Sequence, residues 1–301
     1  MTRLGYQIPN FTYPGLADDQ LFDTVVAQAK EAEAAGFDRV FVMDHFYQLP
    51  MLGAPDEPMY EGYTLLSALA QHTERVRLAT LVTGNTYRNP TLLAKTVTAL
   101  DHVSHGRATL GIGAGWFELE HEQLGFEFGT FTDRFEKLEE ALQIVLPMLR
   151  DERPTLAGER YRVTEAANRP PPVGRIPVLI GGSGEKKTLR MVAQYGDESN
   201  LTCELDEIPR KLDALAAHCD RLGRNRDEIV VTKLQAVVVA PTEQEVLADM
   251  RAMGEVKGWG DDVLELVRAA AVVGDPDSVG ERLSELMAAG IDGLVVSLPA
   301  N

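Results

Sequence analysis

The chain has 301 residues, of which 45% are hydrophobic and 25% are charged, and its formal net charge is -17. This composition is typical of a soluble globular protein with a sizeable core. Nucleic acids and anionic membranes bind to basic surfaces, so a chain this acidic argues against both kinds of partner. The length fits one α/β barrel domain with insertions.

The cysteines and the N-terminal residues indicate in which cellular compartment the protein works. Cys203 and Cys219 have neither metal-ligand spacing nor the pattern of a secreted disulfide framework. The chain starts without an apolar signal segment, and no apolar run approaches the roughly 20 residues that a membrane span needs. We therefore expect a cytoplasmic protein.

Strands and helices alternate in the first half of the chain. In order, the pattern predicts a strand over 4–8, a helix over 20–35, a strand from residue 39, a long loop over 47–61, a helix over 63–72, a strand over 76–82, a helix over 91–103, a strand over 107–112 and an irregular acidic segment up to residue 130. Asp18 or Asp19 is expected to cap the first of these helices, and Asn89 the third, with Pro90 in its first turn. The long loop directly follows a strand that ends in Asp44 and His45. This placement favours a lid that faces the substrate.

The alternation continues in the second half. In order, we expect a helix over 132–149, a small hairpin around Gly158, a strand over 177–180, a helix over 185–195, a strand over 198–201, a helix over 208–222 that Gly223 ends, a strand over 229–239, a helical insertion over 242–272, a helix that Asp275 and Pro276 start and that runs to residue 289, and a strand over 291–296.

Eight strands that mostly alternate with helices predict a (β/α)8 barrel, and no change of composition divides residues 1–301 into two domains. The competing architecture is an open doubly wound sheet. It is disfavoured because no Gly-x-Gly-x-x-Gly motif follows the first strand.

Asp44 and His45 stand at the C-terminal end of the second predicted strand. In an α/β barrel the C-terminal edge of the strands carries the chemistry, and a histidine titrates near neutrality, so His45 is a candidate general acid or base. The alternative is a histidine that only hydrogen-bonds the adjacent loop. The other histidines lack a partner pattern, and we interpret them as surface or structural residues: His72, His102, His105, His121 and His218.

Gly181-Gly-Ser-Gly184 lies between a predicted strand and a helix. Its backbone amides could bind phosphate oxygens at the start of that helix. Lys186 and Lys187 fall in the expected first turn, where a cation opposes the helix dipole, and this placement makes better sense beside a bound anion. The alternative is a tight turn with no ligand.

Small polar residues mark the ends of two other strands. Thr80, Thr83 and Asn85 follow the third strand and could bind the polar edge of a ring, and Thr202 follows the sixth. Strand propensity and turn chemistry explain them equally well. Gly113-Ala-Gly115 before Trp116 could admit a flat ring or serve only to pack the barrel. A metal site is not indicated, because the chain has no His-x-His in its first strand, no His-Glu-x-x-His and no cysteine cluster.

These motifs together, in this order, resemble the bacterial luciferase-like superfamily of flavin and deazaflavin enzymes, and most of all its actinobacterial branch that uses coenzyme F420. The segments that carry the resemblance are Gly5-Tyr-Gln-Ile-Pro-Asn10, Phe41-Val-Met-Asp-His-Phe46, Asn89-Pro90, Gly111-Ile-Gly-Ala-Gly-Trp116, Ile180-Gly-Gly-Ser-Gly-Glu-Lys-Lys187, Gly274-Asp-Pro-Asp277 and Gly290-Ile-Asp-Gly-Leu294. They span nearly the whole chain, and the fold of that superfamily is also a (β/α)8 barrel.

The resemblance implies a role for each site residue. Asp44 would contact the deazaflavin ring, and His45 would face the substrate as proton donor or acceptor. Thr80-Leu81 matches the place where the family often has a cis non-prolyl peptide under the ring, and Thr83 would bind the ring edge. The phosphate group would be held by four residues with a fifth nearby, which are Gly181, Gly182, Ser183, Gly184 and Thr202.

One position departs from the family pattern. The glucose-6-phosphate dehydrogenase of the family has a glutamate where this chain has Trp116, which puts oxidation of a sugar phosphate in doubt. Glu118 or Glu120 could replace that acid. The aromatic residues after Trp116 and the methionines of the loop suggest a partly apolar small-molecule substrate.

The resemblance implies hydride transfer between C5 of F420 and a small organic substrate. One alternative is an FMN-dependent two-component monooxygenase, and a second is a non-catalytic barrel that binds the cofactor. A homodimer is common in the family and is expected here.

Overall fold

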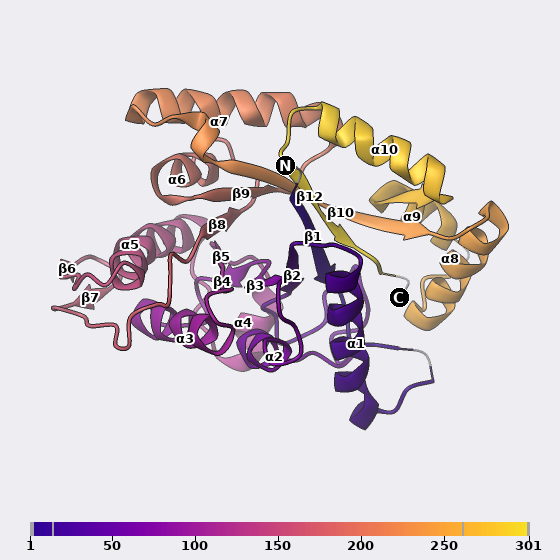
Figure 1. Ribbon diagram of the computed structural model, residues 1–301, viewed down its shortest axis with the longest axis horizontal. Helices are drawn as coiled ribbons and strands as arrows, with labels where there is room; N and C mark the ends of the chain where they lie inside the picture. The colour runs from indigo at the N-terminus through magenta and orange to yellow at the C-terminus, as the bar shows by residue number, and fades with distance from the viewer. Residues whose placement is uncertain (1–2, 14, 261, 300–301) are drawn as a thin grey trace.

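The computed structural model describes residues 3–13, 15–260 and 262–299. One parallel sheet curves into a barrel at its centre, with helices around the outside (Figure 1). The strands along this sheet are β3 (Arg77–Thr80), β2 (Arg39–Val42), β1 (Arg3–Ile8), β12 (Gly293–Ser297), β10 (Val230–Val239), β9 (Glu198–Leu201), β8 (Val178–Gly181), β5 (Leu110–Gly113) and β4 (Thr83–Gly84).

The barrel closes because β3 and β4, which stand at the two ends of the strand order, together occupy a single position in the sheet. β4 pairs with β5, and Leu78 in β3 forms a parallel bridge with Ala108 just before β5. The nine strands of the path therefore fill eight positions in the described part of the chain. This confirms the predicted (β/α)8 barrel.

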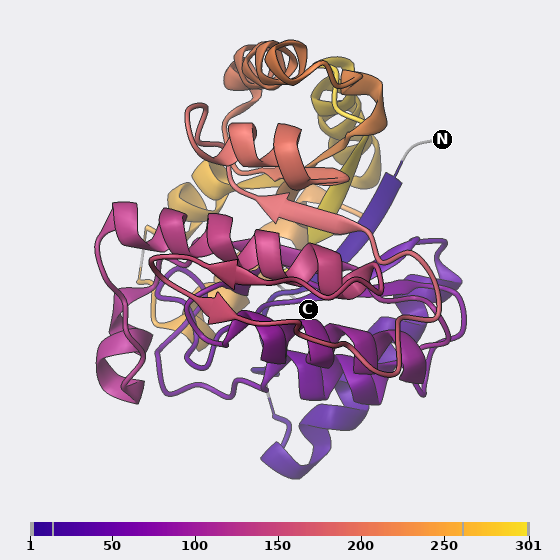
Figure 2. The same cartoon turned by 90° about the vertical axis from the view of Figure 1, so that its left-hand side faces the viewer.

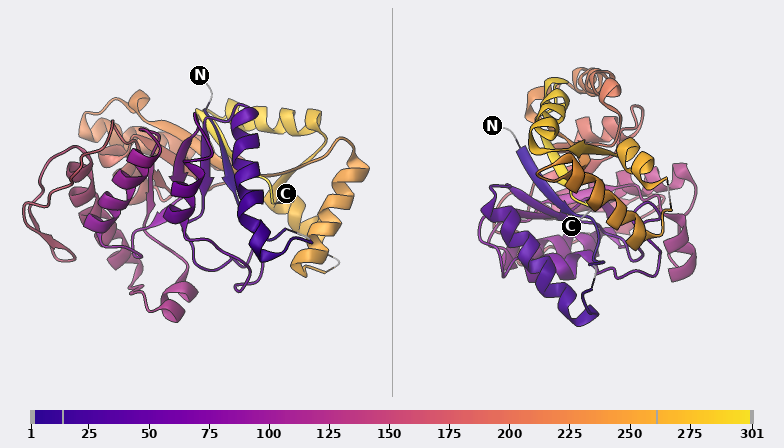
Figure 3. Two further views of the ribbon diagram at one scale, coloured as in Figure 1. Left: turned by 60° about the horizontal axis from the view of Figure 1, so that its bottom comes forward. Right: turned by 90° about the vertical axis from the view of Figure 1, so that its right-hand side faces the viewer.

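Ten α-helices of the described residues flank the sheet: α1 (Leu21–Ala34), α2 (Gly62–Leu69), α3 (Pro90–Val103), α4 (Glu118–Leu124), α5 (Phe131–Leu149), α6 (Thr188–Tyr195), α7 (Ile208–Leu222), α8 (Glu243–Lys257), α9 (Val263–Ala270) and α10 (Pro276–Ala288). Helices α3 and α5 pack side by side on one flank (Figure 2). Helices α8, α9 and α10 gather on the opposite flank (Figure 3). The predicted hairpin is formed by β6 (Leu156–Ala157) and β7 (Arg162–Val163), which project from the barrel.

The short barrel strands β2, β5 and β9 are buried along their whole length, so both of their faces are covered. All four residues of β2 are buried, and the side chain of Phe41 lies in the barrel interior. That interior is a layer of apolar side chains made by Phe41, Ala79, Leu179 and Val295 with Leu81, Val82 and Leu234 beside them. The larger core lies between the outer face of the sheet and the helices.

Glycines on two neighbouring strands make room for Val82 in this layer. A Cβ added to Gly113 or to Gly181 would lie 2.9 Å from a methyl group of Val82. A Cβ on Gly111 would lie 2.0 Å from the carbonyl oxygen of Thr80. These contacts are too close for any larger residue, so the side chain of Val82 fills the space left by Gly113 and Gly181, while Gly111 lets the main chain of Thr80 approach.

A buried ion pair closes the N-terminal end of the barrel. Arg39 and Glu198 are the first residues of β2 and β9, and the guanidinium Nη2 lies 3.0 Å from the carboxylate Oε1. Arg77, the first residue of β3, donates from Nε to the hydroxyl of Thr109 at 3.1 Å. The N-terminal end is therefore filled by structural contacts, and chemistry has to be sought at the C-terminal ends of the strands.

The third strand differs from its prediction over 76–82. It breaks after Thr80, and the cis non-prolyl peptide joins Leu81 to Val82. The position expected from the resemblance, Thr80-Leu81, was wrong by one residue.

Two predictions of irregular or purely helical structure were also wrong. The segment up to residue 130 contains α4, which was missed because its buried residues, Glu120 and His121, are polar and give no apolar period. The insertion over 242–272 ends in a strand, β11 (Ala271–Gly274), which pairs with the far end of β10. It was missed because the apolar run of α9 leads into it without a break.

Helix starts were predicted with mixed success. Asn89 and Asp275 cap α3 and α10 by accepting from backbone amides at 3.0 and 2.9 Å. Neither Asp18 nor Asp19 caps α1, because both lie in a 3-10 turn over Asp18–Gln20 ahead of it. Helix α6 starts at Thr188 rather than at residue 185, so both lysines precede the helix, and the argument from a cation in its first turn was wrong.

Candidate functional site

Asp44 and His45 follow β2 directly at the C-terminal end of the barrel. Asp44 is 1% exposed, and both of its carboxylate oxygens bind Arg88: the Nη1–Oδ2 distance is 2.6 Å and the Nη2–Oδ1 distance is 2.9 Å. Burial raises the pKa of Asp44 although the facing guanidinium opposes the rise. The bidentate geometry is that of a strong charge-assisted pair.

The Asp44–Arg88 pair extends through Tyr63 to the two predicted threonines. The Arg88 guanidinium lies over the Tyr63 ring, with 4.9 Å between its Cζ atom and the ring centroid. The phenol oxygen of Tyr63 is 2.6 Å from the hydroxyl of Thr83, which is 2.8 Å from that of Thr80. Asp44, Thr80 and Thr83, all predicted cofactor residues, thus belong to one connected polar network.

Arg88 and Tyr63 were not foreseen. Arg88 also binds Glu61, whose carboxylate caps α2 by accepting from the amide of Thr64 at 2.7 Å. Asp44 and Glu61 hold the pKa of Arg88 above its ordinary value even though burial acts to lower it. The network therefore links three segments through charged side chains: the loop after β2, the start of α2 and the segment that precedes α3.

His45 joins a different set of residues. Its Nδ1 atom lies 2.8 Å from the Oε2 atom of Glu120, whose side chain is fully buried. Tyr87 donates its phenol proton to the same oxygen, and the amides of Phe46 and Tyr47 donate to the other. Burial acts to raise the pKa of Glu120, but the hydrogen bonds from His45 and its neighbours hold the pKa below its usual value.

Aromatic rings surround the imidazole of His45. The rings of Trp116 and Phe117 lie edge-on to it, with centroids 5.7 and 5.9 Å away. Trp116 is 53% exposed and stacks on Phe117. Phe117 also packs with Met43 and with Leu49, so the loop over 47–61 contacts the aromatic side of the site. The role of this loop as a lid stays a prediction.

The predicted phosphate turn lies between β8 and α6. Gly182 has φ +114°, a backbone conformation that favours glycine, and the amide of Thr202 donates to the hydroxyl of Ser183 at 2.8 Å. The structure therefore brings Thr202 to the turn over 181–184. Lys186 is exposed, whereas Lys187 holds its ammonium 5.2 Å from the ring centroid of Phe131.

Two features fit a flat ligand with a phosphate group. The buried side-chain nitrogen of Asn85 makes no hydrogen bond of normal geometry among the described residues, although it lies near enough to the Tyr161 phenol to act to lower the pKa of that group. This amide could therefore donate to a ring oxygen or nitrogen. The turn over 181–184 leaves its backbone without bulky side chains. These residues are compatible with the phosphate-bearing flavin or deazaflavin that the resemblance implies.

His121 was interpreted as a surface or structural histidine, and it is a buried structural one at 1% exposure. Its Nδ1 donates to the carbonyl oxygen of Phe117 at 2.7 Å, and its Nε2 accepts from the hydroxyl of Thr86 at 2.7 Å. Burial lowers the pKa of His121, which keeps the ring neutral near pH 7.

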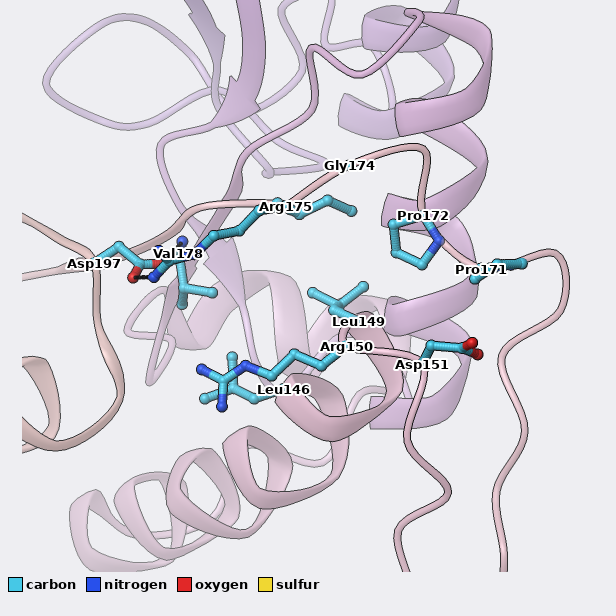
Figure 4. Close-up of a pocket in the computed structure, with 11 residues that line it drawn as sticks. Leu146, Leu149, Arg150, Asp151, Pro171, Pro172, Gly174, Arg175, Val178 and Asp197 are labelled. Carbon is cyan, nitrogen blue, oxygen red and sulfur yellow. Dashed lines mark hydrogen bonds and ion pairs between the residues drawn. The ribbon is translucent and has the colours of Figure 1, made fainter.

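A separate cavity of about 280 Å³ lies at the other end of the barrel (Figure 4). It is lined by the end of α5 and the segment before β8, and Arg175 there is paired with Asp197. Val178, which also lines it, is the first residue of β8, so the cavity lies at the N-terminal ends of the strands. None of the predicted site residues contacts it, and we do not assign it to the site.

The described residues contain no group of three or more His, Cys, Asp or Glu side chains that could hold a metal ion. Within the same residues, no helix is both long and apolar enough to span a membrane.

Comparison with known proteins agrees with the geometry. At 30% identity over 294 residues, the chain is similar to an F420-dependent glucose-6-phosphate dehydrogenase from Microbacterium testaceum, with 90% of this chain and 85% of the relative covered. It is 28% identical to a 5,10-methylenetetrahydromethanopterin reductase from Archaeoglobus fulgidus, covering 90% of this chain and 88% of the relative.

Among solved structures, an F420-dependent secondary alcohol dehydrogenase in complex with an F420-acetone adduct has the same fold. The TM-score is 0.83 at 20% identity, and the match covers 99% of this chain and 93% of the other. A family model described as luciferase-like monooxygenase matches residues 2–293. The chain therefore belongs to the luciferase-like monooxygenase family and is an oxidoreductase.

Proposed function

We propose that this protein is an F420-dependent oxidoreductase that transfers a hydride between the deazaflavin and a small organic substrate. The observation that carries the proposal is His45, which a buried carboxylate holds at the C-terminal end of the barrel beside the exposed ring of Trp116. Relatives with F420 in their names support the choice of cofactor. When bound, F420 supplies a carbon that accepts or donates a hydride.

Each part of the site has a task in this proposal. The network of Asp44, Thr80 and Thr83 supports the ring, with the main chain around Leu81 beneath it. Gly181, Gly182, Ser183, Gly184 and Thr202 bind the phosphate group. His45 moves the proton that accompanies the hydride, because it is the titratable side chain beside the aromatic rings that would receive the substrate.

The substrate we propose is a neutral, partly apolar molecule rather than a sugar phosphate. Trp116 stands where the resemblance places a glutamate in the glucose-6-phosphate dehydrogenase. Near His45 the rings of Trp116 and Phe117 and the apolar residues of the lid offer an apolar surface. The same proposal includes a homodimer, which the family resemblance implies, and a location in the cytoplasm, which the sequence predicts.

The test is a titration of the purified protein with F420 and with FMN, followed by fluorescence, with a turnover assay on a panel of alcohols and carbonyl compounds. We expect micromolar or tighter binding of F420 and a change in F420 absorbance with at least one substrate. The variant His45→Ala should keep cofactor affinity and lose turnover by a factor on the order of 100 to 10,000, the usual size of a general acid-base effect.

Each of the other outcomes points to a different alternative. Binding of FMN without binding of F420 would support the two-component monooxygenase. Tight F420 binding without turnover of any compound would support a non-catalytic barrel. Full activity of His45→Ala would remove His45 from the reaction.

A further inference from the structure

Glu120 is a carboxylate in the first turn of a short helix, a place where acidic side chains are normally solvated. Here its side chain is fully buried, and four groups surround its two oxygens. Oε2 is bound by His45 at 2.8 Å and by Tyr87, and Oε1 is bound by the amide of Phe46 and, at 2.8 Å, by that of Tyr47. A charge removed from water at this cost is retained only where its partners compensate for the lost hydration.

The number and kind of partners determine where the proton of His45 lies. An ionised carboxylate can only accept hydrogen bonds, so all four partners have to donate. Two are backbone amides and one is a phenol, which donate readily. The fourth is Nδ1 of His45, which must therefore carry a proton.

The other ring nitrogen of His45, Nε2, is then the atom that can exchange a proton with a substrate. Nε2 of His45 has no hydrogen-bond partner in the described part of the chain, and the rings next to the imidazole are those of Trp116 and Phe117. With Nδ1 protonated, a neutral His45 presents Nε2 as a base, and a charged His45 presents it as an acid.

We infer that Glu120 is a positioning residue, which fixes the tautomer and the ring orientation of His45 so that Nε2 exchanges the proton with the substrate. The inference rests on the proposed function, since it assigns the atom through which His45 acts. Glu120 does not itself reach the substrate, because its oxygens are occupied and buried. It holds the histidine as a buried carboxylate holds the base in a nucleophile–histidine–acid triad.

The second oxygen of Glu120 adds a mechanical role. Phe46 and Tyr47 stand at the start of the lid over 47–61, and their amides are bound by Oε1 while Oε2 holds the imidazole. One carboxylate thus fixes both the proton-transfer group and the first residues of the lid. A displacement of the lid at this end would also displace His45.

The variant Glu120→Gln separates these roles. If the amide oxygen continues to accept from Phe46 and Tyr47, the amide nitrogen faces Nδ1 of His45. That nitrogen donates, so Nδ1 must lose its proton and Nε2 must gain it. We expect kcat to fall by about 100-fold or more with a smaller change in KM, and the pH profile of kcat to change shape.

The decisive readout is the tautomer of His45, measured by nitrogen-15 NMR of histidine-labelled protein and assigned by loss of the signal in His45→Ala. In the unaltered protein we expect Nδ1 to carry the proton and Nε2 to lack it at high pH, and in Glu120→Gln we expect the reverse. Glu122→Gln is the matched control, since Glu122 is exposed on the same helix, and it should leave both spectrum and kcat unchanged.

An unaltered protein in which Nδ1 lacks the proton overturns the inference, and this outcome does not depend on whether Glu120→Gln folds. A folded Glu120→Gln protein with unchanged tautomer and kcat also overturns it. The NMR result needs neither cofactor nor substrate. A chain that shows the expected tautomers but turns over no compound would therefore contradict the proposed function and leave the positioning role intact.

Discussion

Asp44 and His45 are neighbours in the chain, yet their side chains belong to separate networks. Asp44 is held by Arg88 and connects to the threonines that follow β3, whereas His45 is held by Glu120 from α4. A strand end sends consecutive side chains to opposite sides, which is why adjacent residues reach different partners. The charge of Asp44 is thereby held by Arg88 in the network proposed to support the cofactor, separate from His45, the residue proposed to transfer the proton.

The ion pair of Asp44 should be a large contributor to stability. Asp44→Asn keeps the shape of the side chain but leaves Arg88 with only Glu61 as a carboxylate partner among the described residues. Breaking a buried pair in this way costs about 3 kcal/mol of unfolding free energy. Urea denaturation should show this loss, and fluorescence titration should show weaker F420 binding.

Glu61→Gln is the comparison for this variant. Its side chain is 38% exposed, so the loss of its charge should cost about 1 kcal/mol or less. Equal losses of unfolding free energy in Asp44→Asn and Glu61→Gln would show that the buried pair contributes no more to stability than the exposed one.

The sequence identified the site residues at the strand ends, but not most of the side chains that hold Asp44 and His45 in place. Asp44, His45, Thr80 and Thr83 could be placed on one rim because the C-terminal ends of parallel strands meet there. Arg88, Tyr63 and Glu120 could not, since their role depends on which loop crosses which strand end. The only signal for Glu120 was its nearness to Trp116, the position where the family acid was missing, and Glu118 had the same claim.

At the scale of elements, the side chain of Glu33 connects α1 to the turn before β3 by hydrogen bonds. Glu33, near the end of α1, accepts from the backbone amides of Glu74, Arg75 and Val76 at 3.0, 2.6 and 2.9 Å. Burial acts to raise the pKa of Glu33, but these amides and the charge of Arg75 hold it below its ordinary value of 4.5. The ionised carboxylate therefore stabilises the native state.

This contact should make stability depend on pH. Because the native pKa is lowered, its contribution is present above pH 4.5 and is lost as the pH falls through the native value. Glu33→Gln should lower the unfolding free energy by about 1 kcal/mol at pH 7, allowing for partial exposure. The difference from the unaltered protein should shrink in acid, as urea midpoints over a pH series would record.

The exposed Glu31 on the same helix gives the control, and Glu31→Gln should show no such trend. A constant difference between Glu33→Gln and the unaltered protein down to pH 3 would contradict this explanation.

Helix α7 over 208–222, whose apolar residues recur at helical spacing, was predicted with the bounds that the structure has. Elements whose buried side is polar or whose apolar run joins a neighbour, such as α4 and β11, were not. Their existence depends on contacts with distant segments, which no local pattern contains.

At the scale of the whole molecule, an ion pair connects the predicted lid over 47–61 to the insertion that contains α8. Glu57 in the lid binds Lys257 at the end of α8, with 2.8 Å between Oε2 and Nζ, and the hydroxyl of Thr12 donates to the same oxygen at 2.6 Å. The side chains of Glu57 and Lys257 are 16% and 5% exposed. Segments that follow β1 and β10 therefore meet at the loop over 47–61.

Removing this pair should loosen the lid. Hydrogen exchange of the amides over 47–61 should be faster in Glu57→Gln and in Lys257→Gln, while exchange in β1 and β2 stays slow. The double variant should show a coupling energy of about 1 to 2 kcal/mol in urea denaturation.

Arg282→Gln tests the specificity of that effect, because Arg282 pairs with Glu285 on the exposed surface of α10 and should contribute little. Unchanged exchange in the lid of both Glu57→Gln and Lys257→Gln would show that the lid is held by its apolar contacts alone.

The valine that fills the space left by Gly113 and Gly181 limits how these positions can change in evolution. Residues 82, 113 and 181 share one volume, although they lie on three different segments of the chain. An alanine at either glycine needs a smaller residue at 82, and a smaller residue at 82 alone leaves a hole. Neutral drift at these sites must therefore proceed by matched changes, and diverging lineages should show the three positions varying together or not at all.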